Sequence, residues 1–292
     1  MCICYNLKKN MQTKPDLRPS PIAGTWYEGK PKTLQDNIDA YLDNAELPTL
    51  PGDVIAVIAP HAGHRYSGAV AGYAFAALRG RAPDLVAVIS PMHRPYSQPL
   101  ITSSHDAYST PLGTIPIDKD TINELNATLQ AGLGIGLSPV SHDQEHSLEI
   151  ELPFLQRALA SDFNLLPIMV RAQDPRISQG LGKALAHVLH DKNCVLVAST
   201  DLSHFYDQET AKKLDAEMLH QIEAFSPEGV FEAERSGKGF ACGHAAVAAV
   251  LWAARELGAN TVKVLNYATS GDVTGDYSSV VGYGAAAILK VQ

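Results

Sequence analysis

Short runs of apolar, largely β-branched residues recur along the chain and predict strands. They lie at residues 54–59, 85–90, 165–170, 194–199, 262–267 and 280–289. In most of these runs apolar residues follow one another without the alternation of a half-exposed strand. A continuous apolar run is typical of a sheet that is covered on both faces.

Between these runs, apolar residues recur at the spacing of a helix. The segments are 32–47, 67–78, 121–130, 177–190, 209–224 and 243–257. Ser226 followed by Pro227 predicts a further helix start, with the serine as N-cap and the proline in the first turn. The segment 145–155 fits a strand and a helix equally well. The alternation predicts an α/β sandwich, in which helices flank a mostly parallel central sheet.

The domain organisation follows from where the apolar pattern begins. Residues 1–19 contain several lysine and arginine side chains and few apolar ones, so we expect a mobile N-terminal tail. Residues 20–292 show no linker or repeat and are expected to form a single domain. The chain of 292 residues is 46% hydrophobic and 18% charged, a composition that predicts a large core and excludes a disordered chain.

Charge and hydropathy exclude several classes of partner. The formal net charge is −8, so we expect no general affinity for nucleic acid or an anionic membrane. No apolar run approaches the roughly 20 residues of a membrane span. The first residues lack the apolar region of a secretory signal, so a cytoplasmic protein with free thiols is expected, and Cys2 and Cys4 are interpreted as incidental. The surface composition is compatible with a homodimer.

Three of the eleven histidines follow predicted strands closely. His61 comes just after the run 54–59, His93 after 85–90 and His204 after 194–199. The carboxyl ends of parallel strands meet at one edge of a sheet, where α/β proteins bind their ligands. We therefore expect these imidazoles to converge on one site, whatever that site does.

Other residues near these positions are weaker candidates. Cys242 precedes a strongly apolar helix, whose N-terminus is expected to lower the pKa of the thiol and favour a nucleophile or a soft metal ligand. His64 lies three residues after His61 and can turn the same way. His146 and Glu149 have the spacing that places two side chains on one helix face, as a pair that orients a ligand or as a surface ion pair.

Six motifs, taken in order, resemble those of the Memo family, whose prokaryotic members are also called AmmeMemoRadiSam system protein B. The resemblance covers about residues 18–292. The motifs are Ala23-Gly24-Thr25-Trp26-Tyr27, Ile58-Ala59-Pro60-His61-Ala62-Gly63, Ser90-Pro91-Met92-His93, Glu145-His146-Ser147-Leu148-Glu149, Ser199-Thr200-Asp201-Leu202-Ser203-His204 and Cys242-Gly243-His244.

The resemblance implies a fold like that of the class III extradiol ring-cleaving dioxygenases (LigB-like), which hold non-haem iron(II) between two histidines and a carboxylate. By resemblance, His61 and His93 match the two histidines, and Cys242 stands where a third ligand is expected. The thiolate makes the site softer, so that Fe(II) is the first expectation while copper or zinc also fits. His204 matches the family's acid–base histidine, and Asp201 is expected to orient it.

The family also implies a cleft beside the metal. Trp26 and Tyr66 match aromatic residues that line it, and His64, His146 and Glu149 are expected to border it. His64 departs from relatives that often carry an aromatic residue there, and its imidazole can compete for the metal. A small molecule or peptide is the expected occupant.

Four functions remain open from these residues. The first is a metal-dependent redox or dioxygenase-like enzyme of unknown substrate, in which His204 transfers a proton. The second is a hydrolase, in which a metal held by the same residues activates a water molecule. A non-catalytic module would bind a peptide or small ligand in the cleft without turnover. Finally, Cys242 could act as a nucleophile, with His204 or His244 as its base.

Overall fold

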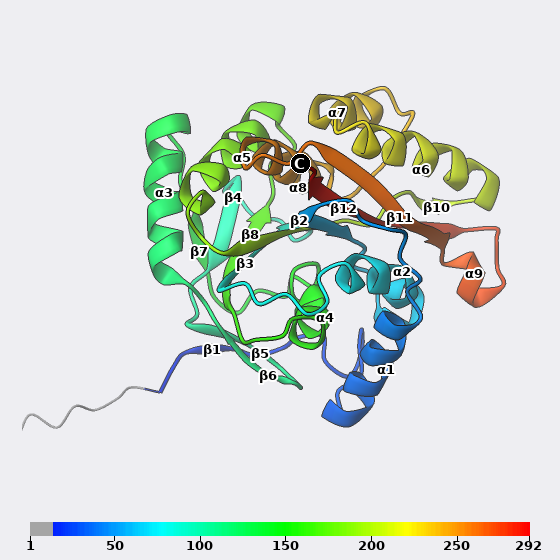
Figure 1. Cartoon of the computed structure of the whole chain (residues 1–292), viewed down its shortest axis with the longest axis horizontal. Coiled ribbons are helices and arrows are strands. Elements are labelled where there is room, and N and C mark those ends of the chain that lie inside the picture. Colours follow the sequence, from blue (N-terminus) through cyan, green and yellow to red (C-terminus); the bar gives the residue numbers. More distant parts are fainter. Residues whose placement is uncertain (1–13) are drawn as a thin grey trace, which may run out of the picture.

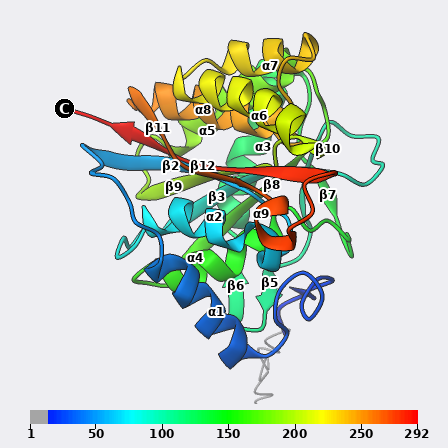
Figure 2. The ribbon, with the colours of Figure 1, turned by 90° about the vertical axis from the view of Figure 1, so that its right-hand side faces the viewer.

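The computed structural model describes residues 14–292, which form an α/β sandwich (Figures 1 and 2). Helices cover both faces of a nine-stranded sheet, so the expected fold class is confirmed. Cys2 and Cys4 and most of the expected tail lie outside the described residues. No helix within 14–292 has both the length and the apolar character needed to cross a bilayer.

The strands belong to two sheets. The large sheet has the order β10-β12-β2-β9-β3-β8-β4-β7, with β11 also paired to β12, and the small one has the order β1-β5-β6. The bounds are β1 Leu17–Arg18, β2 Asp53–Ala59, β3 Leu85–Pro91, β4 Leu100–Ser103, β5 Ala107–Thr110, β6 Gly113–Pro116, β7 Ser138–Val140, β8 Asn164–Val170, β9 Cys194–Ser199, β10 His204–Tyr206, β11 Thr261–Thr269 and β12 Val280–Lys290.

The centre of the large sheet is parallel. Strands β2, β9, β3 and β8 run the same way, while β12 on one side and β4 on the other join antiparallel. Strand β3 is buried along its whole length, and β2, β8 and β9 nearly so. All six predicted strands are confirmed. Cover on both faces explains the continuous apolar composition of five of them, whereas β11 is half-buried along most of its length and includes Lys263 and Asn266.

The helices form one layer on each face of the sheet (Figure 2). Helices α1, α2 and α4 lie on one side, and α5, α6, α7 and α8 on the other. The bounds are α1 Pro31–Asp43, α2 His64–Ala76, α3 Lys119–Leu133, α4 Leu152–Ala158, α5 Pro175–Leu189, α6 Gln208–Glu223, α7 Pro227–Arg235, α8 His244–Glu256 and α9 Gly271–Thr274, with a 3-10 turn at Glu149–Glu151.

The predicted helices are present with shifted ends, and the undecided segment is helical. Helix α2 begins at His64 rather than at residue 67, and α1 ends at Asp43 rather than at 47. The segment 145–155 enters a 3-10 turn at Glu149 and then α4, where Pro153 fits the first turn because its missing N–H is not needed there. Ser226 caps α7 by accepting from the N–H of Gly229, as predicted.

The last residues of the segment predicted to be a mobile tail form a strand in the structure. Leu17 and Arg18 form β1, which pairs with β5, and the Arg18 side chain is 1% exposed. Its guanidinium is bound by the carboxylates of Asp143 and Glu149. A charged residue in a polar stretch resembles a solvated tail in sequence, because its buried partners lie more than a hundred residues away.

Candidate metal centre

The sheet topology brings His61 and His93 to one place. His61 follows β2 and His93 follows β3, and these strands lie on either side of β9 with their carboxyl ends at the same edge. The imidazole ring centroids are 5.2 Å apart. The expected convergence is therefore observed for these two side chains.

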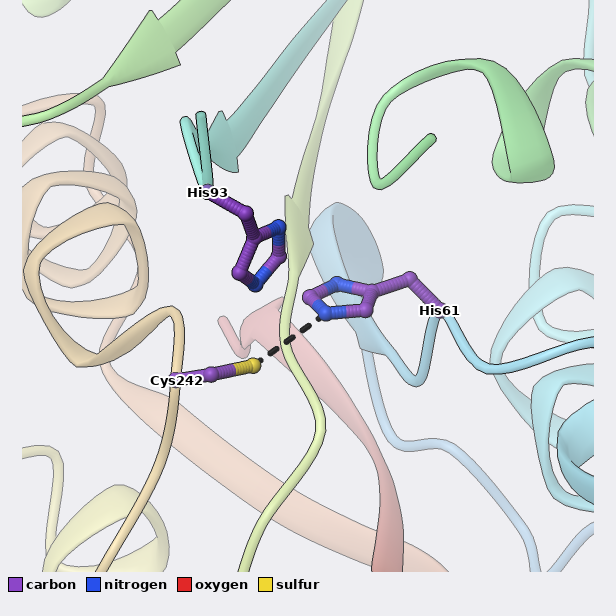
Figure 3. A group of neighbouring side chains, drawn as sticks. All are labelled: His61, His93 and Cys242. Carbon is purple, nitrogen blue, oxygen red and sulfur yellow. Dashed lines mark hydrogen bonds between the residues drawn. The ribbon is translucent and has the colours of Figure 1, made fainter. Parts of the chain in front are cut away.

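Cys242 reaches the same point from the helix layer that contains α8. It precedes α8, which packs on β9 and β3. Its Sγ lies 3.1 Å from Nε2 of His61, and one ligand atom from each of His61, His93 and Cys242 falls within 4.8 Å of the other two (Figure 3). Figure 3 shows the two rings and the sulfur pointing toward one another. Two imidazoles and one sulfur at this separation could hold a metal ion.

Close backbone packing fixes Cys242 in this position. Gly243 donates its N–H to Oγ1 of Thr200 at 2.9 Å. A Cβ at Gly243 would lie 2.4 Å from the carbonyl oxygen of Ser199 and 2.8 Å from Cβ of Thr200. Only glycine therefore lets the start of α8 approach the end of β9 this closely.

Replacing Gly243 with alanine is expected to lower the free energy of unfolding by about 1–3 kcal/mol, because backbone must move to admit the methyl group. Urea unfolding measures this change. Gly132→Ala is the matched control, since no heavy atom lies within 4 Å of the added Cβ and the residue is in α3. The control is expected to stabilise the protein by up to about 1 kcal/mol. Equal effects of the two substitutions would contradict the argument.

Hydrogen bonds fix the tautomer of each imidazole. Nδ1 of His61 lies 2.9 Å from Oγ of Ser199, and Nδ1 of His93 lies 2.9 Å from Oε1 of Glu145. A carboxylate can only accept, so Nδ1 of His93 carries the proton and its Nε2 offers a lone pair. The Ser199 hydroxyl lies 2.7 Å from the carbonyl oxygen of Ser147. When it donates there, Nδ1 of His61 donates to Ser199 and Nε2 faces the sulfur with a free lone pair.

Glu145 was not among the residues predicted from the sequence. Its carboxylate accepts from the backbone N–H of His93 at 2.6 Å as well as from the ring, and from the N–H groups of His146 and Ser147. Burial raises its pKa, but these hydrogen bonds and the neighbouring imidazoles outweigh burial and bring the pKa down to about 2. The clue in the sequence was its place directly before His146.

Ser199 and Glu151 were also missed. Oε1 of Glu151 lies 2.7 Å from Oγ of Ser199, behind His61, and the side chain is fully buried. Burial and the charge of Asp201 raise the pKa of Glu151 well above its usual range, against the hydrogen bond with Ser199. These surroundings therefore disfavour the charged form of the Glu151 carboxyl. The clue in the sequence was a polar residue, Ser199, at the end of an otherwise apolar strand.

The surroundings of His61 and His146 favour the uncharged form of each imidazole. Burial lowers the pKa of His61, and the neighbouring His146, His93 and His204 lower it further. Burial likewise lowers the pKa of His146 to about 4, although Glu145 opposes this. Neutral imidazole is the form that binds metals, so the environment favours ligation.

The pKa of Cys242 differs from the expectation. Burial raises the pKa of the thiol, and the charge of Asp201 adds to this. The N–H of Asp201, at 3.3 Å from Sγ, together with Thr200 and Gly243, acts in the opposite direction but does not outweigh burial. The prediction of a thiol activated by the helix N-terminus alone is wrong, because desolvation dominates. A nearby cation would offset it.

Asp201 does not orient His204. Its Oδ1 accepts from the backbone N–H groups of His61 at 2.7 Å and Ala62 at 3.2 Å, so it holds the loop after β2. Burial raises its pKa to about 7, against these hydrogen bonds. Nδ1 of His204 instead donates to the carbonyl oxygen of Leu202 at 2.8 Å, which leaves Nε2 able to accept a proton.

Two of the residues expected to border the cleft have structural roles instead. His64 is 6% exposed, and its Nε2 lies 3.0 Å from the carbonyl oxygen of Ile150, outside the group formed by His61, His93 and Cys242. Glu149 is fully buried and binds Arg18 and Tyr27. The helical spacing of His146 and Glu149 does not apply, because the helical turn begins only at Glu149.

Trp26 and His146 lie beside the site, and Trp26 and Tyr66 line one cavity together. The Trp26 ring packs on that of His146 with centroids 4.1 Å apart, and the His146 ring is 5.4 Å from that of His61. Trp26 and Tyr66, both 38% exposed, line a cavity of ≈ 490 Å³. A cavity of this size can hold a small molecule.

The fold and this His₂Cys arrangement define an α/β protein with a candidate metal centre at the carboxyl edge of its sheet. The Memo-like protein family matches residues 18–287, and the chain belongs to this family. A MEMO1 family protein of Methanococcoides burtonii is 36% identical over 276 residues, covering 94% of this chain and 100% of the relative. A MEMO1 family protein of Nitrosopumilus maritimus is 32% identical over 274 residues, covering 92% and 98%.

Among solved structures, the uncharacterized protein JW3007 from Escherichia coli K12 is similar over 80% of this chain and 99% of that chain. The TM-score is 0.47 and the sequence identity 13%. A similarity at this level carries no information about function.

Proposed function

We propose that this Memo-family protein is a metal-dependent redox enzyme that holds a non-haem ion, Fe(II) in the first instance, between His61, His93 and Cys242. The supporting observation is the approach of three ligand atoms to within 4.8 Å, with both imidazoles presenting Nε2. A soft thiolate beside two imidazoles suits iron(II) or copper better than it suits magnesium or calcium.

The donor set fits such an ion in charge as well as in geometry. Burial favours the neutral form of the His61 imidazole, and the raised pKa of the Cys242 thiol is an effect that a bound cation would reverse. An iron(II) centre with three protein ligands keeps open positions and, when bound, supplies activation of oxygen or of a ligand.

His204 is the residue proposed to move a proton. Its Nδ1 is held by the carbonyl oxygen of Leu202, so that Nε2 is the free basic nitrogen. Burial lowers its pKa from the ordinary histidine value, and the imidazole is neutral near pH 7. A neutral histidine at a fixed position can act as a general base. Asp201 contributes by holding the backbone of His61 in place.

The test is the metal content of protein purified without oxygen. We expect about one equivalent of iron per chain and a ferrous–nitrosyl signal on exposure to nitric oxide, since open positions would admit that ligand. If the protein contains copper and shows a redox response, the proposal of a redox enzyme stands and only the identity of the ion changes. Zinc alone, without a redox response, would replace the proposal with the metal-dependent hydrolase. Failure to retain any of these ions during anaerobic reconstitution would overturn it.

Glu145→Gln is expected to weaken metal binding about 10- to 100-fold, because an amide fixes the His93 ring less firmly and adds no negative charge behind it. A competition titration with a metal chelator measures the affinity. Glu124→Gln is the control, because this carboxylate is exposed and, among residues 14–292, forms an ion pair only with Lys192 on the surface. If both variants bind the metal equally well, Glu145 has no role in holding His93.

A further inference from the structure

A second cavity is lined by Cys242 but not by His61 or His93. It has a volume of ≈ 750 Å³ and is bordered by α7, by the start of α8 and by residues 240–242. Helix α7 packs on α8 (Figure 2), and residues of both helices line the cavity. Its volume falls within the range of small-molecule sites. Of the residues in the motifs, only Cys242 and His244 line it, and the rest of its wall has no role in the candidate metal centre.

Aromatic rings form much of the cavity wall. Phe231, Phe240 and Trp252 line it, and the ring centroids of Phe231 and Trp252 are 6.2 Å apart. His244 adds a fourth ring, 5.1 Å from Phe231. The electron-rich faces of aromatic rings attract cations, and several rings around one space are the usual way to bind an alkylammonium group.

The charges around the cavity have the complementary sign. Three carboxylates and one guanidinium line it, those of Glu228, Glu232, Glu234 and Arg235. Arg235 forms a close ion pair with Glu232 at 2.7 Å, so no lysine or arginine of the lining pairs with the other two carboxylates. Nδ1 of His244 lies 3.8 Å from Oε2 of Glu234, but it donates its hydrogen bond to the carbonyl oxygen of Ala241 at 3.0 Å.

Glu234 is the better placed of these two carboxylates. Its side chain is 25% exposed, and Oε2 accepts from the backbone N–H of Ala241 at 3.1 Å. Its Oε1 has no hydrogen-bond partner within residues 14–292. Glu228 accepts at Oε1 from the indole N–H of Trp252 at 3.1 Å, which fixes an edge of the aromatic wall.

We propose that this cavity binds an organic cation, an ammonium group carried on an apolar body. The rings receive the apolar body and the alkyl groups of the ammonium, and Glu234 supplies the opposite charge. A neutral apolar occupant would desolvate Glu234 without compensation, and an anion would be repelled by it. Because Cys242 also lines the cavity, a bound cation lies next to the candidate metal centre.

The test uses benzyltrimethylammonium as the probe and isothermal titration calorimetry of the full chain. Benzyl alcohol and benzoate have the same ring with neutral and negative groups. We expect the cation to bind and the two comparison compounds to bind at least about fivefold more weakly. Equal affinity for benzyl alcohol, or no binding of the cation, would overturn the proposal.

Two variants locate the site. Glu234→Gln keeps an acceptor for the N–H of Ala241 and removes the charge, and Phe231→Leu removes one ring. Each is expected to weaken the probe about fivefold or more. Glu232→Gln is the matched control, with an expected change below about twofold, because its charge is already paired at the exposed rim. Unchanged affinity in both Glu234→Gln and Phe231→Leu would place the probe elsewhere and refute the assignment.

The result is independent of the proposed metal-dependent function. Metal content is measured on the same samples, and we expect Glu234→Gln to retain its metal while losing affinity for the probe. If the parent protein binds the probe but no metal, the metal proposal alone is refuted. The reverse result would refute the cation site alone.

Discussion

Replacement of Cys242 with serine is expected to lower the affinity for iron at least about tenfold, because a neutral hydroxyl is a poor substitute for a thiolate. The substitution keeps the shape of the side chain and leaves His61 and His93 in place. The measurement is elemental analysis after anaerobic reconstitution, followed by a chelator competition to obtain the affinity. Circular dichroism of the metal-free protein checks that the fold is retained.

The chain offers a matched control for this substitution. Cys194, at the start of β9, is also a free thiol, but it contacts the carbonyl oxygen of Leu189 at 3.8 Å and belongs to no group of metal-ligating side chains among residues 14–292. Cys194→Ser is expected to retain the full metal content. If Cys242→Ser also retains it, the sulfur is not a ligand, and the three-ligand proposal is wrong.

The sheet could be predicted because its signal is local. A strand buried on both faces must be apolar throughout, so β2, β3, β8, β9 and β12 are recognisable from short stretches of sequence. The convergence of His61 and His93 follows from the same fact, since each histidine comes two residues after a parallel strand. Cys242 could be added only through the family resemblance, because nothing near it in sequence indicates where α8 docks.

The residues behind the imidazoles could not be predicted in the same way. Glu145 and Ser199 act on rings that lie about fifty and more than a hundred residues away in sequence. Asp201 shows the opposite error: its proximity to His204 in sequence suggested a contact, while the chain turns the carboxylate toward the loop after β2. Which group a carboxylate reaches depends on backbone direction, and sequence spacing gives that only within a regular element.

The short strands also lay beyond a sequence-based prediction. Strands β4 to β7 and β10 have three or four residues each, too few to establish an alternation. They form where neighbouring elements leave backbone groups to be paired. The burial of Arg18 could not be predicted for the same reason, because it depends on β5 and on the loop before the 3-10 turn.

The second large effect is expected for Arg18→Met, which should lower the free energy of unfolding by about 3–5 kcal/mol. The Arg18 guanidinium forms two hydrogen bonds with Asp143, at 2.7 and 2.8 Å, and one with Glu149 at 2.5 Å. The side chains of Asp143 and Glu149 are 4% and 0% exposed, so without Arg18 two carboxylates would lie in the interior without a cation. Urea unfolding near pH 7 measures the loss.

A surface pair provides the comparison that separates burial from charge pairing. Arg79 also binds an aspartate, Asp43, but these side chains are 47% and 63% exposed. Arg79→Met is expected to change the stability by less than about 1 kcal/mol, because water replaces the lost partner. Adding Glu149→Gln to Arg18→Met should recover part of the lost free energy of unfolding, since it removes one of the two buried carboxylate charges that have no cationic partner. Similar effects of Arg18→Met and Arg79→Met would mean that the N-terminal strand contributes little to the stability of the fold.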